Sequence, residues 1–197
     1  MRKLPFLFAL CTLLASCLDA GTVSPGPAPN FGRYQPIYMS VARIDVLEEY
    51  KSPMRPPNAE HLMPYSPADA MQIWIKQRLK ASGGGKTMQI IIKDASVIEK
   101  PLPTTEGVMG MFSTEPDREY RARLEVEMRI YGDAALSEAS ISVVATRSLQ
   151  MREDETLTTR DQKFRGMMTE MMTTMNAEME KNIFQYLGPY VNFSINP

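Results

Sequence analysis

Residues 119–131 read EYRARLEVEMRIY, and this stretch indicates the fold more directly than any other part of the chain. Apolar residues alternate with charged ones here, and the apolar set is Tyr120, Ala122, Leu124, Val126, Met128 and Ile130. Successive side chains of a strand point to opposite faces, so the pattern predicts a strand with one buried and one solvated face. Gly132–Asp133 follows and favours a short hairpin connection. The stretch therefore predicts an antiparallel sheet that is covered on one side.

Three further segments are predicted strands. Residues 36–47 alternate apolar and polar positions with one phase shift, and residues 87–100 and 137–149 are rich in β-branched residues. Between the first two lie residues 51–65, where four prolines remove amide donors and fix the backbone angle. We expect a long loop there.

Two amphipathic helices complete the pattern. Ser66–Pro67–Ala68–Asp69 is typical of a helix start, and this helix should run to about Ser82. Its apolar face repeats at helical spacing through Met71, Trp74, Ile75, Arg78 and Leu79. The second helix should begin near Thr158 or Thr159 and end at about Leu187, before Gly188–Pro189. Its predicted stripe is Phe164, Met168, Met171, Met175, Met179, Ile183 and Tyr186, with Glu170, Asn176, Glu180 and Gln185 elsewhere.

The resulting order is β-α-β-β-β-α. We expect an α+β fold of two layers, in which a four-stranded, mostly antiparallel sheet carries both amphipathic helices on one face.

An export signal opens the chain. Arg2 and Lys3 precede an apolar run from Leu4 to Leu14, which has the length of a signal peptide and is too short to span a bilayer. The run ends in Leu14–Ala15–Ser16–Cys17, which resembles the bacterial lipobox, where the cysteine is lipidated and becomes the mature N-terminus. The alternatives are an ordinary cleaved signal in which Cys17 is incidental and an apolar tail that only resembles a signal. We expect a signal peptide at 1–16, lipidated Cys17 with a flexible tether at 17–33, and one periplasm-facing domain at 34–197.

Composition restricts the partners. The chain has 22 Lys and Arg against 23 Asp and Glu, and loss of Arg2 and Lys3 with the signal leaves 20 against 23. No basic field for nucleic acid is present, so we expect no nucleic-acid partner. Cys11 lies in the signal and Cys17 would carry lipid, so the mature domain has no thiol for a disulfide or a metal.

Candidate catalytic and metal-binding residues are few. His61 is the single histidine, and neither a zinc site nor a catalytic triad can be assembled around it from the sequence. Acidic pairs such as Glu48–Glu49 and the run Glu153–Asp154–Glu155 look like solvated surface. We expect no catalytic residue, no metal ligand and no cofactor. The alternatives are an enzyme acting on envelope polymers and a periplasmic copper-handling protein, in which Met167 and Met172 would offer exposed thioethers to copper(I).

The connection from Thr104 to Arg118 is unusually apolar. Val108, Met109, Met111 and Phe112 fall where a loop should be exposed, and exposed apolar groups often mark a contact with a protein or a lipid. These four residues are the predicted partner or lipid contact. Alternatively, the loop folds back over an open end of the core.

The lipobox, the tether and the order of elements together resemble the small outer-membrane lipoproteins that include the ABC-transport auxiliary, YajG-like and LptE-like lipoproteins. The resemblance covers the layout of residues 34–190. It implies a lipid-anchored, non-enzymatic accessory or binding module in outer-membrane assembly or lipid transport, with an envelope protein or lipid as partner. In such lipoproteins, Leu18 after the cysteine implies the outer membrane, with the domain facing the periplasm.

Overall fold

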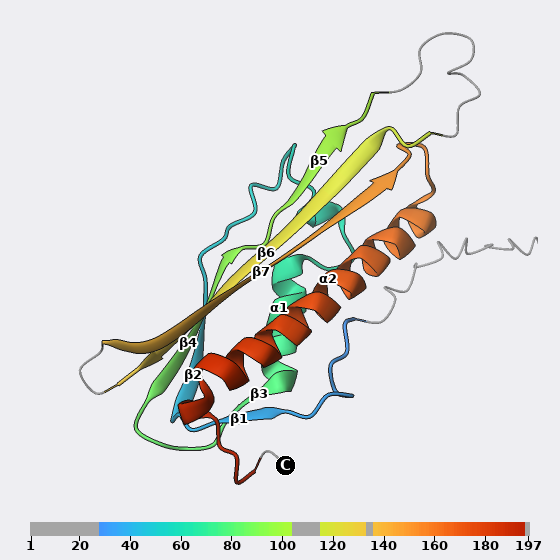
Figure 1. Ribbon diagram of the computed structural model, residues 1–197. Coiled ribbons are helices and arrows are strands. Elements are labelled where there is room, and N and C mark those ends of the chain that lie inside the picture. Colours follow the sequence, from blue (N-terminus) through green and yellow to red (C-terminus); the bar gives the residue numbers. More distant parts are fainter. Residues whose placement is uncertain (1–27, 104–114, 133–135, 196–197) are drawn as a thin grey trace, which may run out of the picture.

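Strand β6 (Arg118–Tyr131) is the central strand of the sheet, and it has the buried and the solvated face that its alternating sequence predicts. The computed structural model describes residues 28–103, 115–132 and 136–195 (Figure 1). On one edge β6 pairs antiparallel with β7 (Ser137–Met151) along its whole length. On its other edge it pairs antiparallel with β4 (Thr87–Asp94) and then with β5 (Val97–Pro101). These pairings confirm the predicted, mostly antiparallel sheet.

The predicted strand at 87–100 is in fact two strands, because the chain bends at Ala95–Ser96. The Asp94 carboxylate accepts a 2.9 Å hydrogen bond from the Ser96 amide, and the register against β6 shifts between Ile92 and Asp94. Such a local side-chain bond competes with the regular ladder and interrupts it. β4 and β5 therefore follow one line along β6 as separate strands.

The predicted strand at 36–47 also divides. β1 (Ile37–Met39) pairs in parallel with β3 (Leu79–Ala81), whereas β2 (Arg43–Glu48) pairs in parallel with β4 as the outer strand of the main sheet. The chain changes sheets at the phase shift seen in the sequence. Gly84, at φ 119°, lies against this crossing, where an added Cβ would come within 3.0 Å of the Ser40 carbonyl oxygen.

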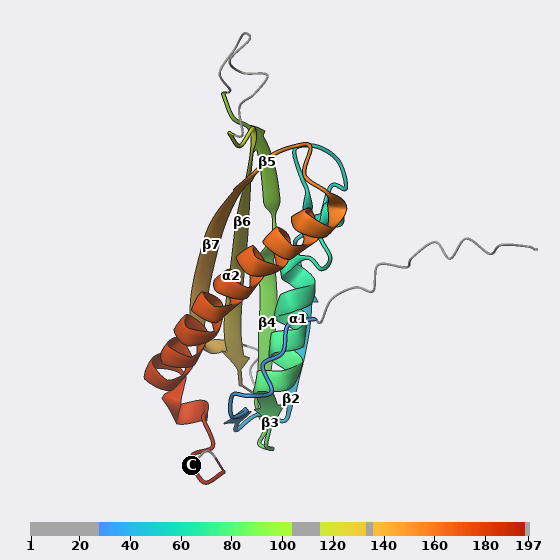
Figure 2. The same ribbon diagram turned by 90° about the vertical axis from the view of Figure 1, so that its right-hand side faces the viewer.

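Both helices lie on one face of the sheet, as expected (Figure 2). α1 (Pro67–Arg78) begins with the predicted capping box between Ser66 and Asp69. It ends before the expected Ser82, because residues 79–81 extend to pair with β1. α2 (Leu157–Tyr186) is capped by Thr156, so it starts slightly before the predicted Thr158 or Thr159. Short 3-10 turns occur at Glu60–Leu62 (η1) and Gly188–Tyr190 (η3).

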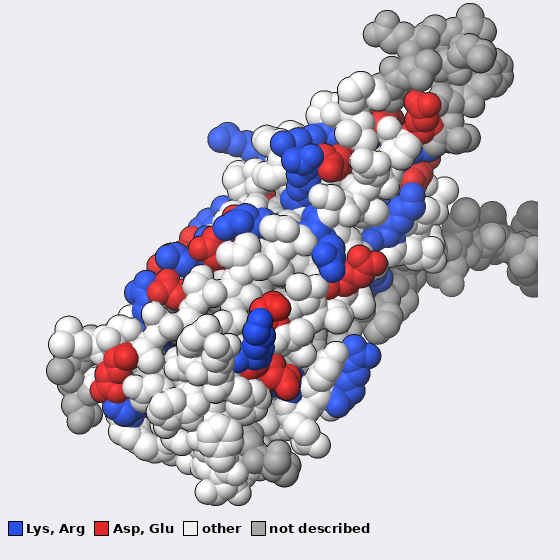
Figure 3. Space-filling view, viewed as in Figure 1, with Lys and Arg blue, Asp and Glu red and all other residues white. Residues whose placement is uncertain are grey.

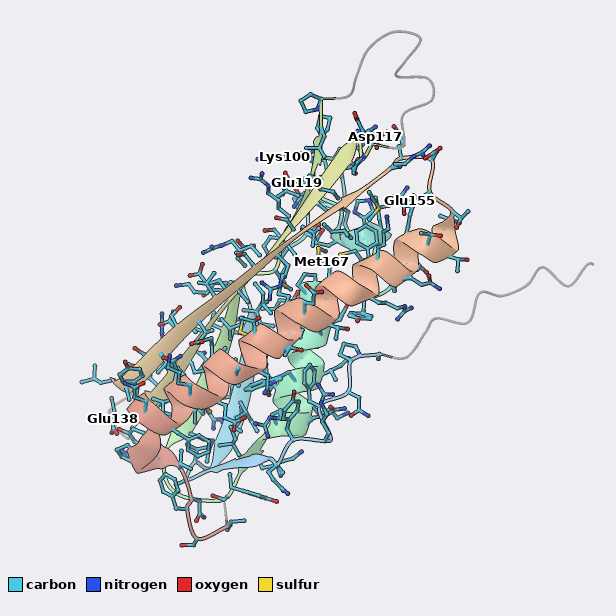
Figure 4. The ribbon with its side chains drawn as sticks, turned by 45° about the vertical axis from the view of Figure 1, so that its right-hand side comes forward. Lys100, Asp117, Glu119, Glu138, Glu155 and Met167 are labelled. Atoms are coloured by element: carbon cyan, nitrogen blue, oxygen red, sulfur yellow. The ribbon has the colours of Figure 1, made fainter. Side chains whose placement is uncertain are left out.

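The core lies between this helical layer and the sheet. Trp74 of α1 and the inward residues of β6 are buried together with the methionines of α2. Met167 and Met172, which we expected at the stripe edges, are buried too, and Figure 4 shows Met167 on the side of α2 that faces the sheet. The expectation that these two thioethers are exposed and available to copper(I) is therefore wrong. The two-layer α+β fold is confirmed, with a five-stranded main sheet and the separate β1–β3 pair in place of four strands.

Candidate binding cavity

A cavity of about 440 Å³ opens where the C-terminal ends of both helices meet the segment that precedes β1. Residues 33–37 form one wall, Arg78 of α1 contributes from the interior, and Glu180 and Phe184 of α2 form the opposite wall. The cavity thus combines a cation, a carboxylate and aromatic groups from three separate parts of the chain.

Arg78 is the central polar group of the cavity. Its side chain is only 2% exposed, and its guanidinium forms an ion pair with the Glu180 carboxylate. Its carbon Cζ lies 5.2 Å from the centre of the Tyr34 ring, a cation–π geometry that also holds Tyr34 in the wall. Arg33 approaches the same ring at 4.9 Å.

Asn176 supports Arg78 from within the core. Its Oδ1 accepts hydrogen bonds from Arg78 Nε at 3.1 Å and from Trp74 Nε1 at 2.8 Å. A carbonyl oxygen has two lone pairs, so one atom can satisfy both buried donors. Asn176 and Glu180 are one turn apart on α2 and so hold the guanidinium from two directions.

Burial lowers the pKa of Arg78, while the Glu180 carboxylate and Tyr34 oppose that shift. The guanidinium remains a cation near neutral pH, because the arginine side chain does not lose its proton in proteins. Glu180 is 42% exposed at its side chain, so it can turn to solvent without being stranded. A ligand phosphate or carboxylate could then take its place on Arg78, since both suit the planar guanidinium.

A second buried polar cluster surrounds Glu60 of η1. The Glu60 Oε1 atom accepts hydrogen bonds from Tyr50 Oη at 2.5 Å, Asn58 Nδ2 at 3.0 Å and the Val97 amide at 2.8 Å. Burial raises the pKa of Glu60, but these donors outweigh it, and the pKa lies below its ordinary value. Burial and the neighbouring Glu60 carboxylate raise the pKa of Tyr50. The cluster fastens the 51–65 loop to β5.

A group of charged side chains gathers at the far end of the sheet, where Figure 4 labels Lys100, Asp117, Glu119 and Glu155. Asp117 accepts the Glu153 amide at 2.8 Å, Glu119 pairs with Arg121 at 2.8 Å, and Glu155 accepts Lys163 Nζ at 2.5 Å. Glu153 and Asp154 are exposed, whereas Glu155 is partly buried. Asp117, Glu119 and Glu155 are thus engaged in contacts within the protein.

The structure leaves several sequence-predicted residues untested. Cys17 and the predicted contact residues Val108, Met109, Met111 and Phe112 lie outside the described residues. His61 is exposed in η1, away from the cavity. Within the described part of the chain, no three His, Cys, Asp or Glu side chains are grouped so as to hold a metal ion.

Sequence reasoning missed the cavity and its polar groups. Arg78 was visible as the one charged residue in the apolar stripe of the first helix, and such an interruption can signal a buried, paired charge. Asn176, which we expected off the stripe, is buried at 4% exposure because it bonds Trp74 and Arg78. Tyr186, which we expected on the apolar stripe, is exposed.

Comparisons with known proteins leave the family open. No protein-family model and no curated protein matches the chain. Among solved structures, a minor lipoprotein from Acinetobacter baumannii is similar over 74% of this chain and 92% of its own, with 12% identity and a TM-score of 0.38. This level of similarity carries no functional argument. None of the helices in the described residues is long and apolar enough to cross a bilayer.

Proposed function

We propose that the chain is an outer-membrane lipoprotein, lipidated at Cys17, whose domain is a non-enzymatic binding module in envelope assembly or lipid transport. The observation that carries the binding role is the Arg78 cavity. Its volume of about 440 Å³ lies within the usual size of small-ligand sites, which is about 300–1,000 Å³. The lipobox pattern ending in Cys17 supports the membrane location.

The lining favours an anionic amphiphile. Arg78 offers a cation at the inner side, and Tyr34, Pro36 and Phe184 offer apolar surface around it. A phosphate-bearing envelope lipid has this combination of an anionic head and apolar chains. Val108, Met109, Met111 and Phe112 remain our proposed contact with an envelope partner.

Lipid analysis tests the binding role directly. The full lipidated chain is purified from membranes, and co-purifying lipids are identified by mass spectrometry. We expect an anionic lipid to accompany the native chain and to be lost from Arg78→Met, which keeps the apolar stem of the side chain but removes its charge. Arg147→Met is the matched control, because Arg147 is a half-buried arginine beside α2 that does not line the cavity. Equal lipid recovery from all three proteins, or none from the native chain, would contradict the proposal.

The anchor has its own test. Metabolic labelling with palmitate should mark the native chain and leave Cys17→Ser unlabelled, and sucrose-gradient fractionation should place the labelled protein with outer membranes. Label in Cys17→Ser, or native protein in the inner-membrane fractions, would overturn this part of the proposal.

A further inference from the structure

Large apolar side chains are exposed where α2 ends. Phe184, Tyr186, Phe193 and Ile195 are 39%, 57%, 61% and 46% exposed, and we refer to them as the aromatic end surface. The rings of Phe184 and Phe193 contact each other, with their centres 6.1 Å apart. This contact joins the last turns of α2 to the C-terminal segment, so the surface is continuous between them.

The same region lacks charged side chains. Residues 182–197 contain no Asp, Glu, Lys, Arg or His, whereas charged residues make up 23% of the chain. Figure 3 shows the corresponding end of the molecule, near the C-terminus, as an uncharged area. Its polar groups are neutral, as in Gln185, Asn192 and Ser194. Tyrosine is enriched at the boundary between lipid and water, and phenylalanine side chains of interfacial segments are buried there.

The C-terminal segment is held in place. The Asn192 amide donates to the Tyr38 carbonyl at 2.8 Å, the Ser40 amide donates to the Tyr190 carbonyl at 2.7 Å, and Val191 bridges to Met39. Val191 is thereby buried, whereas Phe193 and Ile195 remain exposed. Their exposure follows from attachment to β1 and is not fraying of a chain end.

The described segment that follows the proposed anchor comes close to this surface. Residues 33–37 line the Arg78 cavity together with Phe184, so this described segment lies beside one residue of the aromatic end surface. Between Ala28 and Cys17 there are 28 − 17 = 11 residue steps. A fully extended chain of that length reaches about 36–40 Å. An anchor at Cys17 would therefore keep Ala28 within about 36–40 Å of the bilayer.

We infer that the aromatic end surface is a second membrane contact, which inserts into the interfacial layer of the bilayer to which Cys17 is anchored. This inference rests on the proposed lipidation. Phe184 belongs both to this surface and to the wall of the Arg78 cavity. Contact with the bilayer would therefore bring the cavity beside the lipid surface from which an amphiphile could enter.

A dye at Ser194 tests the contact in the full lipidated chain. Ser194→Cys provides a single thiol, because Cys11 is lost with the signal and Cys17 is acylated, and an environment-sensitive dye is attached to it. Ser142→Cys is the matched control, since Ser142 is also exposed but lies on the solvated face of β7. Both proteins are reconstituted into vesicles of phosphatidylethanolamine and phosphatidylglycerol, with and without nitroxide-labelled lipids.

We expect the emission at position 194 to shift to the blue, to be quenched by the nitroxide lipids and to be protected from aqueous iodide. The dye at 142 should show none of these changes, and adding Phe184→Ser and Phe193→Ser should abolish them at 194. Free access of iodide at 194 in vesicle-bound protein would overturn the inference. A blue shift without nitroxide quenching that disappears on dilution would also overturn it and indicate a second copy on the surface. Failure of the lipidation itself appears separately, as protein that lacks acyl mass and does not enter vesicles.

Discussion

Glu60 is a buried carboxylate on which several donors converge, and its substitutions separate charge from hydrogen bonding. Tyr50, Asn58 and the Val97 amide all donate to its Oε1 atom. Glu60→Gln keeps an oxygen there but loses the charge, and we expect it to lower the free energy of unfolding by about 1–2 kcal/mol. Glu60→Ala leaves the donors without an acceptor and should cost about 3 kcal/mol or more. Urea unfolding at neutral pH measures both, and equal losses would contradict this account.

The same carboxylate should make stability depend on acid. Burial raises the pKa of Glu60, but the hydrogen bonds from Tyr50, Asn58 and Val97 bring it below the ordinary value. The folded state therefore favours the ionised form. The resulting stability is complete above the unfolded-state pKa of about 4.3 and is lost as the pH falls through the lower folded-state pKa. The free energy of unfolding should fall in this range more steeply for the native chain than for Glu60→Gln. Parallel pH profiles would show that other carboxylates dominate.

At the scale of elements, the two helix starts differ in how fully they are capped. Ser66 Oγ accepts the Asp69 amide at 3.1 Å, and the Asp69 carboxylate accepts the Ser66 amide at 3.0 Å. Thr156 Oγ1 accepts the Thr159 amide at 3.3 Å without such a return bond. Ser66→Ala should lower the free energy of unfolding by about 1 kcal/mol, and Thr156→Ala should cost less. Urea unfolding of both variants checks this, and a larger loss at Thr156 would contradict it.

The sequence predicted those features of the helices and strands that depend on residues close together in the chain. The Ser66–Asp69 box and the alternation along β6 depend on neighbouring residues, so both could be recognised. The end of α1 could not, because Leu79 leaves the helix to pair with Ile37, more than forty positions earlier. The break at Ala95–Ser96 involves a hydrogen bond from the Ser96 amide to the Asp94 side chain, which competes with an otherwise favourable strand pattern.

At the scale of the whole molecule, the cavity could not be predicted from the sequence either. Tyr34, Arg78 and Glu180 come from distant parts of the sequence and meet only after α1 and α2 pack together. Arg78 alone was recognisable as unusual, because it interrupts an apolar stripe. The partner that makes its burial possible, Asn176, could not be separated by spacing from an ordinary surface asparagine.

The position of β6 predicts how the backbone exchanges hydrogen across the whole sheet. β6 has partners on both edges throughout, since the Arg123 amide donates to the Ser96 carbonyl at 2.8 Å between its pairings with β4 and β5. Among the described strands, β7 pairs with β6 alone. Alternate amides of such an outer strand point away from its partner.

Amide exchange followed by NMR on Cys17→Ser, which carries no lipid, should therefore show continuous protection through β6. Through β7, from Ser137 to Met151, protection should alternate from residue to residue, because only every second amide is bonded to β6. β2, another outer strand of the main sheet, is the internal control and should also contain unprotected amides. Continuous protection along β7 would contradict the expectation and show that its outer edge is also hydrogen-bonded in solution. Loss of that extra protection on dilution would then identify a second copy as the partner.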